Sequence, residues 1–274
     1  MPTSLSALRQ QLARLMGETV LATPAASPER LTTSEFGVAA LAVYEDNYFL
    51  DWQGRFYQGT HKDTNFVVTD SKKANGKLTI GPALAAVVDT TDRAELYQDF
   101  TATELNDAIN LAISMVQDVA LEDGEPAYLT VAKDTYEYPV PAGFVYIEAI
   151  YQESSTGGRY RATQDRVDAR GWNILRGASP RIWFDSAYLT LTENRRLRII
   201  GQKQPSELTL DTDTTEISKV YLIYQAKALL HQSRIRGRGA DFEEHEEQMR
   251  TAQGLADRER LRLAVPGRGW KVGF

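Results

Sequence analysis

The chain contains no cysteine, and this absence excludes several kinds of chemistry at once. Without cysteine there can be no disulfide, no thiolate metal site and no cysteine nucleophile. The sequence also lacks any apolar run near the roughly 20 residues that a membrane-spanning helix requires. Its first apolar segment, residues 5–16, is interrupted by Arg9, Gln10, Gln11 and Arg14, which is not the pattern of a secretory signal peptide. We therefore expect no contact with a membrane.

Histidine is scarce as well, because only His61, His231 and His245 occur and they lie far apart in the sequence. His245 stands in a run of glutamates: Glu243, Glu244, Glu246 and Glu247. One interpretation is a metal site made by His245 and a glutamate three or four residues away. The interpretation that we favour is a solvated helix face, with His231 at the edge of a helical core. The sequence thus predicts no metal site and no cofactor.

Motifs for catalysis are nearly absent. No serine lies in a G-x-S-x-G sequence, and no glycine-rich loop ends in Gly-Lys-Ser or Gly-Lys-Thr. One string, Asp211-Thr212-Asp213-Thr214-Thr215, matches the D-x-D-x-T pattern of haloacid-dehalogenase-like phosphotransferases. Too few residues follow it for the βα units that such an enzyme needs. We favour Asp213 as the N-cap of a helix, with Glu216 three residues later, and predict no catalytic residue.

Four helices are predicted, over residues 4–16, 102–123, 214–234 and 241–263. In the first, Ser4 is the N-cap and Gly17 ends the helix, behind an apolar stripe of Leu5, Leu8, Leu12 and Leu15. The second begins with a capping box formed by Thr101 and Glu104. The fourth is highly charged and has only a thin apolar stripe, which indicates packing against a single neighbour.

Between the helices, aromatic and β-branched residues alternate with turn residues. Asn75-Gly76 is the strongest short-range hairpin signal, so residues 37–88 are predicted to form a small antiparallel β-subdomain, although residues 38–43 also fit a helix. Further strands are predicted at residues 128–132, 137–140, 144–151, 182–184, 188–191 and 197–200. The predicted fold class is α+β: a helical bundle of about four helices, two inserted antiparallel β-subdomains and an extended C-terminal arm.

One group of residues suits contacts between subunits. Arg234, Arg236 and Arg238 form the densest basic cluster, but no aromatic residues alternate with them as in nucleic-acid sites. As cations at a helix C-terminus they complement the helix dipole, and they could also face an acidic surface of a neighbouring subunit. Together with Phe242 and Met249 of the fourth helix, they are our candidates for a subunit interface.

A second group lies at the C-terminus, in residues 265–274. Trp270 and Phe274 stand there next to Arg268 and Lys271 on a chain rich in glycine. Aromatic residues on an extended segment are typical anchors for a groove on a partner. The alternative is a disordered terminus.

Three segments together carry a resemblance to a known family. They are the helix that begins Asp99-Phe100-Thr101-Ala102-Thr103-Glu104-Leu105-Asn106-Asp107-Ala108-Ile109-Asn110, the stretch Tyr138-Pro139-Val140-Pro141-Ala142-Gly143-Phe144, and Leu197-Arg198-Ile199-Ile200-Gly201 leading into residues 205–213 and the next helix. With these segments the chain resembles the head-to-tail adaptor (connector) proteins of tailed bacteriophages. The resemblance covers residues 5–16 and 100–232, whereas residues 36–96 have no counterpart and resemble an insertion.

The resemblance implies a structural virion protein, made in the host cytoplasm, that forms a ring between the portal and the tail at the neck of the virion. The implied partners are the portal protein, neighbouring copies in a ring of twelve, a downstream tail or neck protein, and double-stranded DNA that passes through without sequence-specific binding. The net charge of −6 is compatible with a channel wall to which DNA does not adhere. No enzymatic activity is expected.

The implied domain layout has an N-terminal helix and linker at residues 1–35, a β-rich insertion at 36–97, an adaptor core at 98–263 and a C-terminal docking arm at 264–274. In this layout Arg268, Trp270, Lys271 and Phe274 dock on the portal. Two alternatives stay open. One is a tail-completion or tail-tube protein, and the other is a glycan-binding β-module that uses Tyr48, Trp52 and Tyr57.

Overall fold

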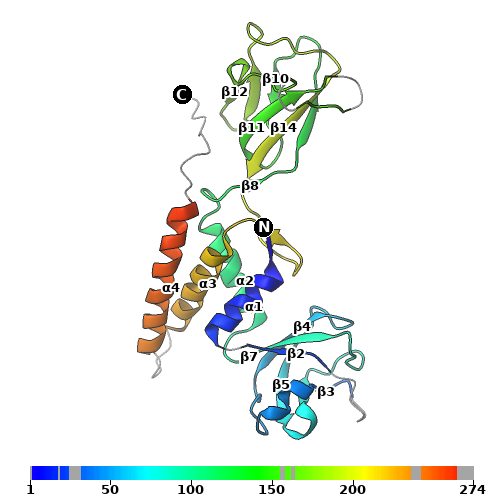
Figure 1. The fold of residues 1–274 in the computed structure, drawn as a ribbon, viewed down its shortest axis with the longest axis vertical. Coiled ribbons are helices and arrows are strands. Elements are labelled where there is room, and N and C mark those ends of the chain that lie inside the picture. The colour runs from blue at the N-terminus through cyan, green and yellow to red at the C-terminus, as the bar shows by residue number, and fades with distance from the viewer. Residues whose placement is uncertain are drawn as a thin grey trace. The chain divides into compact units, whose positions relative to one another are not determined.

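The computed structural model describes residues 2–17, 19–24, 32–154, 158–161, 164–235 and 242–263. The chain divides into two compact units. The first unit comprises Met1–Met115 and Ser206–Leu263, and the second comprises Val116–Pro205 with Ala264–Phe274. Helices and antiparallel sheets occupy separate stretches of the chain, so the predicted α+β class is confirmed (Figure 1).

The first unit contains a bundle of four helices, as predicted. They are α1 (Leu5–Met16), α2 (Ala102–Ser114), α3 (Lys219–Arg234) and α4 (Phe242–Leu263). Helices α1, α2 and α3 pack against one another, and α4 packs against α3 (Figure 1). The first helix has the predicted ends, because Ser4 accepts a hydrogen bond from the Ala7 N–H and Gly17 adopts a left-handed conformation with φ of 78°. A short pair of strands, β1 (Thr3–Ser4) and β15 (Thr214–Thr215), holds the start of α1 beside the segment that precedes α3.

Helix α2 begins with the predicted capping box, in which the Thr101 side chain accepts from the Glu104 N–H and the Glu104 carboxylate accepts from the Thr101 N–H. The predicted end at residue 123 is wrong, because the helix stops at Ser114. Beyond it the backbone turns, and β8 (Glu122–Asp123) pairs with strand β14 (Arg196–Lys203). Backbone pairing with a distant strand thus competes successfully with continuation of the helix, although the apolar spacing persists to Val116 and Ala120.

The predicted start of α3 is also wrong, because Asp213 does not cap this helix. The Asp213 carboxylate instead accepts hydrogen bonds from the N–H groups of Thr209 and Leu210, both at 2.8 Å, and so stabilises a turn. Thr214 and Thr215 then form β15, and the helix begins only at Lys219 after Ser218. An aspartate can satisfy a nearby turn as readily as a helix N-terminus, and the pairing with β1 favours the turn.

A curled antiparallel sheet of six strands completes the first unit (Figure 1). In spatial order its strands are β2 (Thr19–Ala22), β7 (Arg93–Tyr97), β4 (Gln53–Gln58), β5 (Asn65–Lys72), β6 (Lys77–Gly81) and β3 (Glu35–Gly37). Phe36, Phe56 and Phe66 meet at its centre, with ring centroids 4.9 to 5.8 Å apart. Residues 39–43, which also fitted a helix in the sequence, form a short 3₁₀ helix.

The predicted hairpin at Asn75-Gly76 is confirmed. Lys72 of β5 pairs with Lys77 of β6, and Asn75 and Gly76 have φ of 64° and 56°. A second glycine is required by packing, because a Cβ atom on Gly54 would lie 2.2 Å from the Phe66 ring on the neighbouring strand. Gly54 therefore leaves the space that the Phe66 ring occupies in the core of the sheet.

The second unit consists of two antiparallel sheets around a core of its own. In one sheet β14 is central, flanked by β11 (Phe144–Gln152) on one side and by β8 and β9 (Ala127–Thr130) on the other. The other sheet has the order β10 (Glu137–Pro139), β13 (Arg181–Phe184) and β12 (Trp172–Leu175). The predicted strand at residues 188–191 is wrong, since these residues form no strand and Tyr188 is 72% exposed. Strand β12, which the sequence analysis missed, supplies the third strand instead.

Within the described ranges, no helix is both long enough and apolar enough to cross a bilayer.

Candidate interaction surface on helices α3 and α4

Helix α4 packs against α3 through small and polar side chains. The two helices run antiparallel (Figure 1), so that residue 225 faces residue 253 and residue 231 faces residue 245. Of the α4 side chains, Ala252 and Ala256 are the buried ones, whereas α3 buries most of one side. Met249, Leu255 and Leu263 are half buried. Burial of apolar surface is the main source of packing free energy, so these few side chains hold this 22-residue helix only modestly.

Two pairs of polar side chains connect the helices across this seam. Gln225 and Gln253 exchange hydrogen bonds through their amides, at 3.2 and 3.3 Å. One helical turn and a half further along, the Nδ1 atoms of His231 and His245 are 3.0 Å apart. Polar pairs fix which residues face each other, but each contributes only about 1 kcal/mol of net stability. The seam is therefore specific in register and modest in strength.

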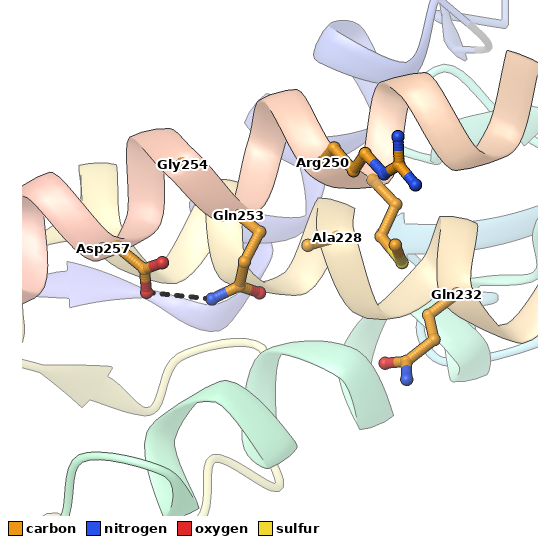
Figure 2. Close-up of a pocket in the computed structure, with 7 residues that line it drawn as sticks. Ala228, Gln232, Arg250, Gln253, Gly254 and Asp257 are labelled. Carbon is orange, nitrogen blue, oxygen red and sulfur yellow. Dashed lines mark hydrogen bonds between the residues drawn. The ribbon is translucent and has the colours of Figure 1, made fainter.

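A groove of about 440 Å³ lies on the surface between the two helices (Figure 2). It is lined by Ala228, Gln232, Met249, Arg250, Gln253, Gly254 and Asp257. The groove exists because Ala228 and Gly254 are small, and a Cβ atom placed on Gly254 would meet nothing within 4 Å. Its rim is polar and Met249 supplies an apolar, flexible contact, a combination that suits one side chain of a protein partner.

The structure places the subunit-interface candidates in different surroundings. Met249 lines the groove, and Phe242, at the start of α4, is 43% exposed. Arg234 instead has partners within the chain: it donates to the Asp99 carbonyl at 2.6 Å and its guanidinium lies 4.6 Å from the centre of the Phe100 ring. Arg236 and Arg238 lie outside the described residues, as do the docking candidates Arg268, Trp270, Lys271 and Phe274.

A buried ionic network, which the sequence patterns did not predict, joins elements of the first unit. At its centre is Arg9 on α1, whose side chain is fully buried. Its guanidinium donates to Glu95 on β7 at 2.9 Å and to both carboxylate oxygens of Asp211 at 2.7 and 3.1 Å. Tyr97 and Asn106 accept further hydrogen bonds from Arg9, each at 3.2 Å. The position of Arg9 beside the apolar stripe of α1 could have indicated this network, because a helix that buries one face must pair any charge on that face.

The network gives the aspartates of the D-x-D-x-T string structural roles, so no catalytic role is needed to account for them. Burial raises the pKa of Asp211, but the hydrogen bond and charge of Arg9 outweigh burial, so the pKa of this carboxyl lies below its usual value. Asp211 is thus an ionised partner of Arg9, and Asp213 stabilises a turn. The residues described in the structure contain no group of three or more histidine, aspartate or glutamate side chains that could hold a metal ion. His245 contacts His231 across the helix seam rather than a glutamate ligand set.

The aromatic residues considered for glycan binding do not form an open platform. Trp52 is 7% exposed and packs edge-on against Phe49, with ring centroids 4.9 Å apart. Tyr48 is half exposed, but its ring stacks on Tyr44. Trp52 therefore belongs to the core of the six-stranded sheet, and Tyr57 is half buried.

Comparison with known proteins gives the family. No curated protein matches the chain. Among solved structures, a chain from the neck of an empty GTA particle, determined with C6 symmetry, is 17% identical, with 61% of this chain and 82% of that chain covered. The TM-score of 0.25 is too low to establish a shared fold. The family model of the SU10 adaptor protein matches residues 78–269, well over half of the sequence and including α2, α3 and α4. Adaptors of this kind are structural proteins rather than enzymes, and the chain belongs to the SU10 adaptor protein family.

Proposed function

We propose that this protein is a structural component of a phage-like virion, where it forms a ring between the portal and the tail. In this proposal it bridges head and tail and lines the channel through which double-stranded DNA passes. The observation that carries the proposal is the match of residues 78–269 to an adaptor family. The neck origin of the similar solved chain agrees with this location but adds no structural argument.

The arrangement of α3 and α4 supports assembly with neighbouring copies. Helix α4 uses one side to pack on α3 and leaves the rest of its surface exposed, including Phe242 and Leu261. The groove with Met249 lies on the same pair of helices. We propose that this surface, together with Arg234, Arg236 and Arg238, contacts the adjacent subunit. A ring of this kind needs a head-to-tail interface that closes, and twelve copies is the number that the family resemblance implies.

The C-terminal segment 264–274 is the proposed docking arm for the portal, with a downstream tail or neck protein on the opposite side of the ring. Ordering a glycine-rich segment costs about 1–2 kcal/mol per residue. Exposed ion pairs made by Arg268 and Lys271 would contribute only about 0–1 kcal/mol each. Trp270 and Phe274 must therefore supply most of the binding free energy, since truncation of such anchors costs at least about 2 kcal/mol. Repetition around a ring then strengthens attachment through avidity.

The test uses the full chain, a chain truncated after Leu263, and a Trp270→Ala/Phe274→Ala double variant. Each is mixed with portal-bearing heads, and bound protein is quantified after sedimentation. We expect both altered chains to lose attachment. A matched control is Tyr188→Ala, which removes an exposed aromatic residue from the second unit and should bind normally. Unchanged attachment of both altered chains would rule out the arm as the anchor. Absence of the protein from purified necks would refute the function itself.

A further inference from the structure

The contact between His231 and His245 has properties that the proposed function does not use. His231, on α3, is only 8% exposed, and its Nε2 atom has no hydrogen-bond partner in the described part of the chain. Its Nδ1 atom lies 3.0 Å from Nδ1 of His245 on α4, and the ring centres are 5.2 Å apart. At this distance one imidazole must donate its Nδ1–H to the bare Nδ1 of the other. The contact therefore accommodates one proton between the two Nδ1 atoms but not two.

Charging both imidazoles would place two N–H donors and two positive charges face to face. The other charged groups nearby do not compensate for this. Lys227, on α3 itself, adds a further positive charge near His231 and donates to the Leu15 carbonyl of α1 at 3.3 Å. From α2, Glu104 is already paired with Arg234 at 3.4 Å.

The glutamates beside His245 on α4 do not compensate a positive charge on the histidine pair either. Glu246 pairs with Arg250 at 2.5 Å. Glu243, Glu244 and Glu247 are exposed to solvent. Their charge is therefore screened by water and salt, and within the described residues none of these carboxylates forms an ion pair with His231. The closed contact of α3 with α4 thus disfavours the doubly charged pair.

We propose that the contact of His231 with His245 is a pH-sensitive clasp, which holds α4 on α3 at neutral pH and releases it in mildly acidic solution. The release is local because α4 packs mainly on α3, where its fully buried side chains are Ala252 and Ala256 and one glutamine pair adds hydrogen bonds. Release of α4 would uncover the α3 side of the seam and remove one wall of the groove. This inference goes beyond the proposed function and does not depend on it.

The direction and size of the effect follow from the His231 imidazole. Burial, Lys227 and His245 lower the pKa of His231 from 6.5 to about 4. The closed form therefore binds one proton fewer than the open form between these two pH values, so stability of the closed form is complete above 6.5 and is lost as pH falls towards 4. Linkage through one proton makes the opening equilibrium constant about 20-fold larger at pH 5 than at pH 7, and nearly 30-fold larger than at pH 7.5.

Hydrogen exchange of the full chain, followed by mass spectrometry at pH 7.5 and pH 5, measures this opening. An isolated, highly charged helix is marginally stable, so the amides of α4 exchange when it leaves α3. After correction for the intrinsic pH dependence of exchange, protection of the α4 amides should fall about 30-fold. Protection of the α2 amides should not fall, which excludes global acid unfolding.

Variants identify the histidine responsible. His231→Gln keeps a hydrogen-bonding side chain that does not titrate, and its α4 protection should be the same at both pH values. His61→Gln removes the histidine of the six-stranded sheet and should respond as the unaltered chain does. Should His231→Gln fail to fold by circular dichroism, His245→Gln removes the facing charge and should show a smaller fall. Equal α4 protection at both pH values in the unaltered chain, or an undiminished fall in His231→Gln (in His245→Gln, if His231→Gln does not fold), would overturn the proposal.

Discussion

Replacement of Arg9 by methionine is the most informative test of what holds the first unit together. Arg9 joins α1 to β7 through Glu95 and to the segment before α3 through Asp211. Methionine has similar length and suits a helix, so the change removes the charge and its hydrogen bonds without removing much volume. The Glu95 side chain is 0% exposed, and it would be left as a buried carboxylate without its arginine.

The expected loss of stability is large for this reason. Removal of one partner from a buried ion pair typically costs about 3–5 kcal/mol, because the other charge stays buried and uncompensated. Asp211 is less affected, since Arg55 lies 3.5 Å away and partly replaces Arg9. Restoring neutrality should recover much of the loss, so the double variant Arg9→Met/Glu95→Gln should be more stable than Arg9→Met alone. Arg14→Met, an exposed position on the same helix, should change stability by less than about 0.5 kcal/mol.

Urea denaturation at neutral pH, followed by circular dichroism, gives the free energy of unfolding of each variant. The same series at low pH tests the role of Asp211. Its lowered folded pKa means that it contributes stability above its ordinary pKa of 3.8, and that this contribution disappears as pH falls through the lower folded value. Arg9→Met should therefore weaken the acid dependence of stability below 3.8. An Arg9→Met protein within about 1 kcal/mol of the unaltered chain would refute the view that the network is a buried, coupled set of charges.

Two further predictions concern local structure. Gly54→Ala places a Cβ atom 2.2 Å from the Phe66 ring, and we expect a loss of about 1–3 kcal/mol from overpacking, whereas Gly254→Ala, which meets open space, should not destabilise. Thermal unfolding of the two variants compares them directly, and equal midpoints would contradict the packing argument. Thr101→Ala removes the Thr101 half of the α2 capping box and should cost about 1 kcal/mol, whereas Thr101→Ser should retain the cap. Urea midpoints measure this difference, and a Thr101→Ala protein as stable as the serine variant would show that the cap contributes nothing.

The sequence predicted features whose physical cause is local. The capping box at Thr101, the left-handed end of α1 at Gly17 and the hairpin at Asn75-Gly76 each depend on a few adjacent residues, and all three are confirmed. The same is true of the thin apolar stripe of α4, which packs mainly against one neighbour. The fold class and the presence of the four helices follow from such signals, because periodicity records which face each element buries.

Features that depend on distant partners were decided only by tertiary structure. Apolar spacing continues past Ser114, yet the chain leaves the helix because Glu122 and Asp123 pair with β14. Asp213 looked like a helix cap because the pairing of Thr214 and Thr215 with β1, more than 200 positions earlier in the chain, is invisible in local sequence. The strand expected at residues 188–191 failed for the same reason, since alternation cannot tell whether a neighbouring strand is available.

The candidate interaction surface on α3 and α4 likewise depends partly on local sequence and partly on tertiary structure. Sequence singled out Met249 and Phe242 through the apolar stripe of α4, but the groove beside Met249 exists only because Ala228 and Gly254 come together from two helices. The pairs Arg9 with Asp211 and His231 with His245 join residues that are far apart in the sequence. Periodicity and capping are encoded in neighbouring residues, so sequence alone determined the presence of the four helices and their apolar faces. Charge pairing and strand pairing require that the chain first bring distant residues together, so only the tertiary structure decided which charges are buried and where the helices end.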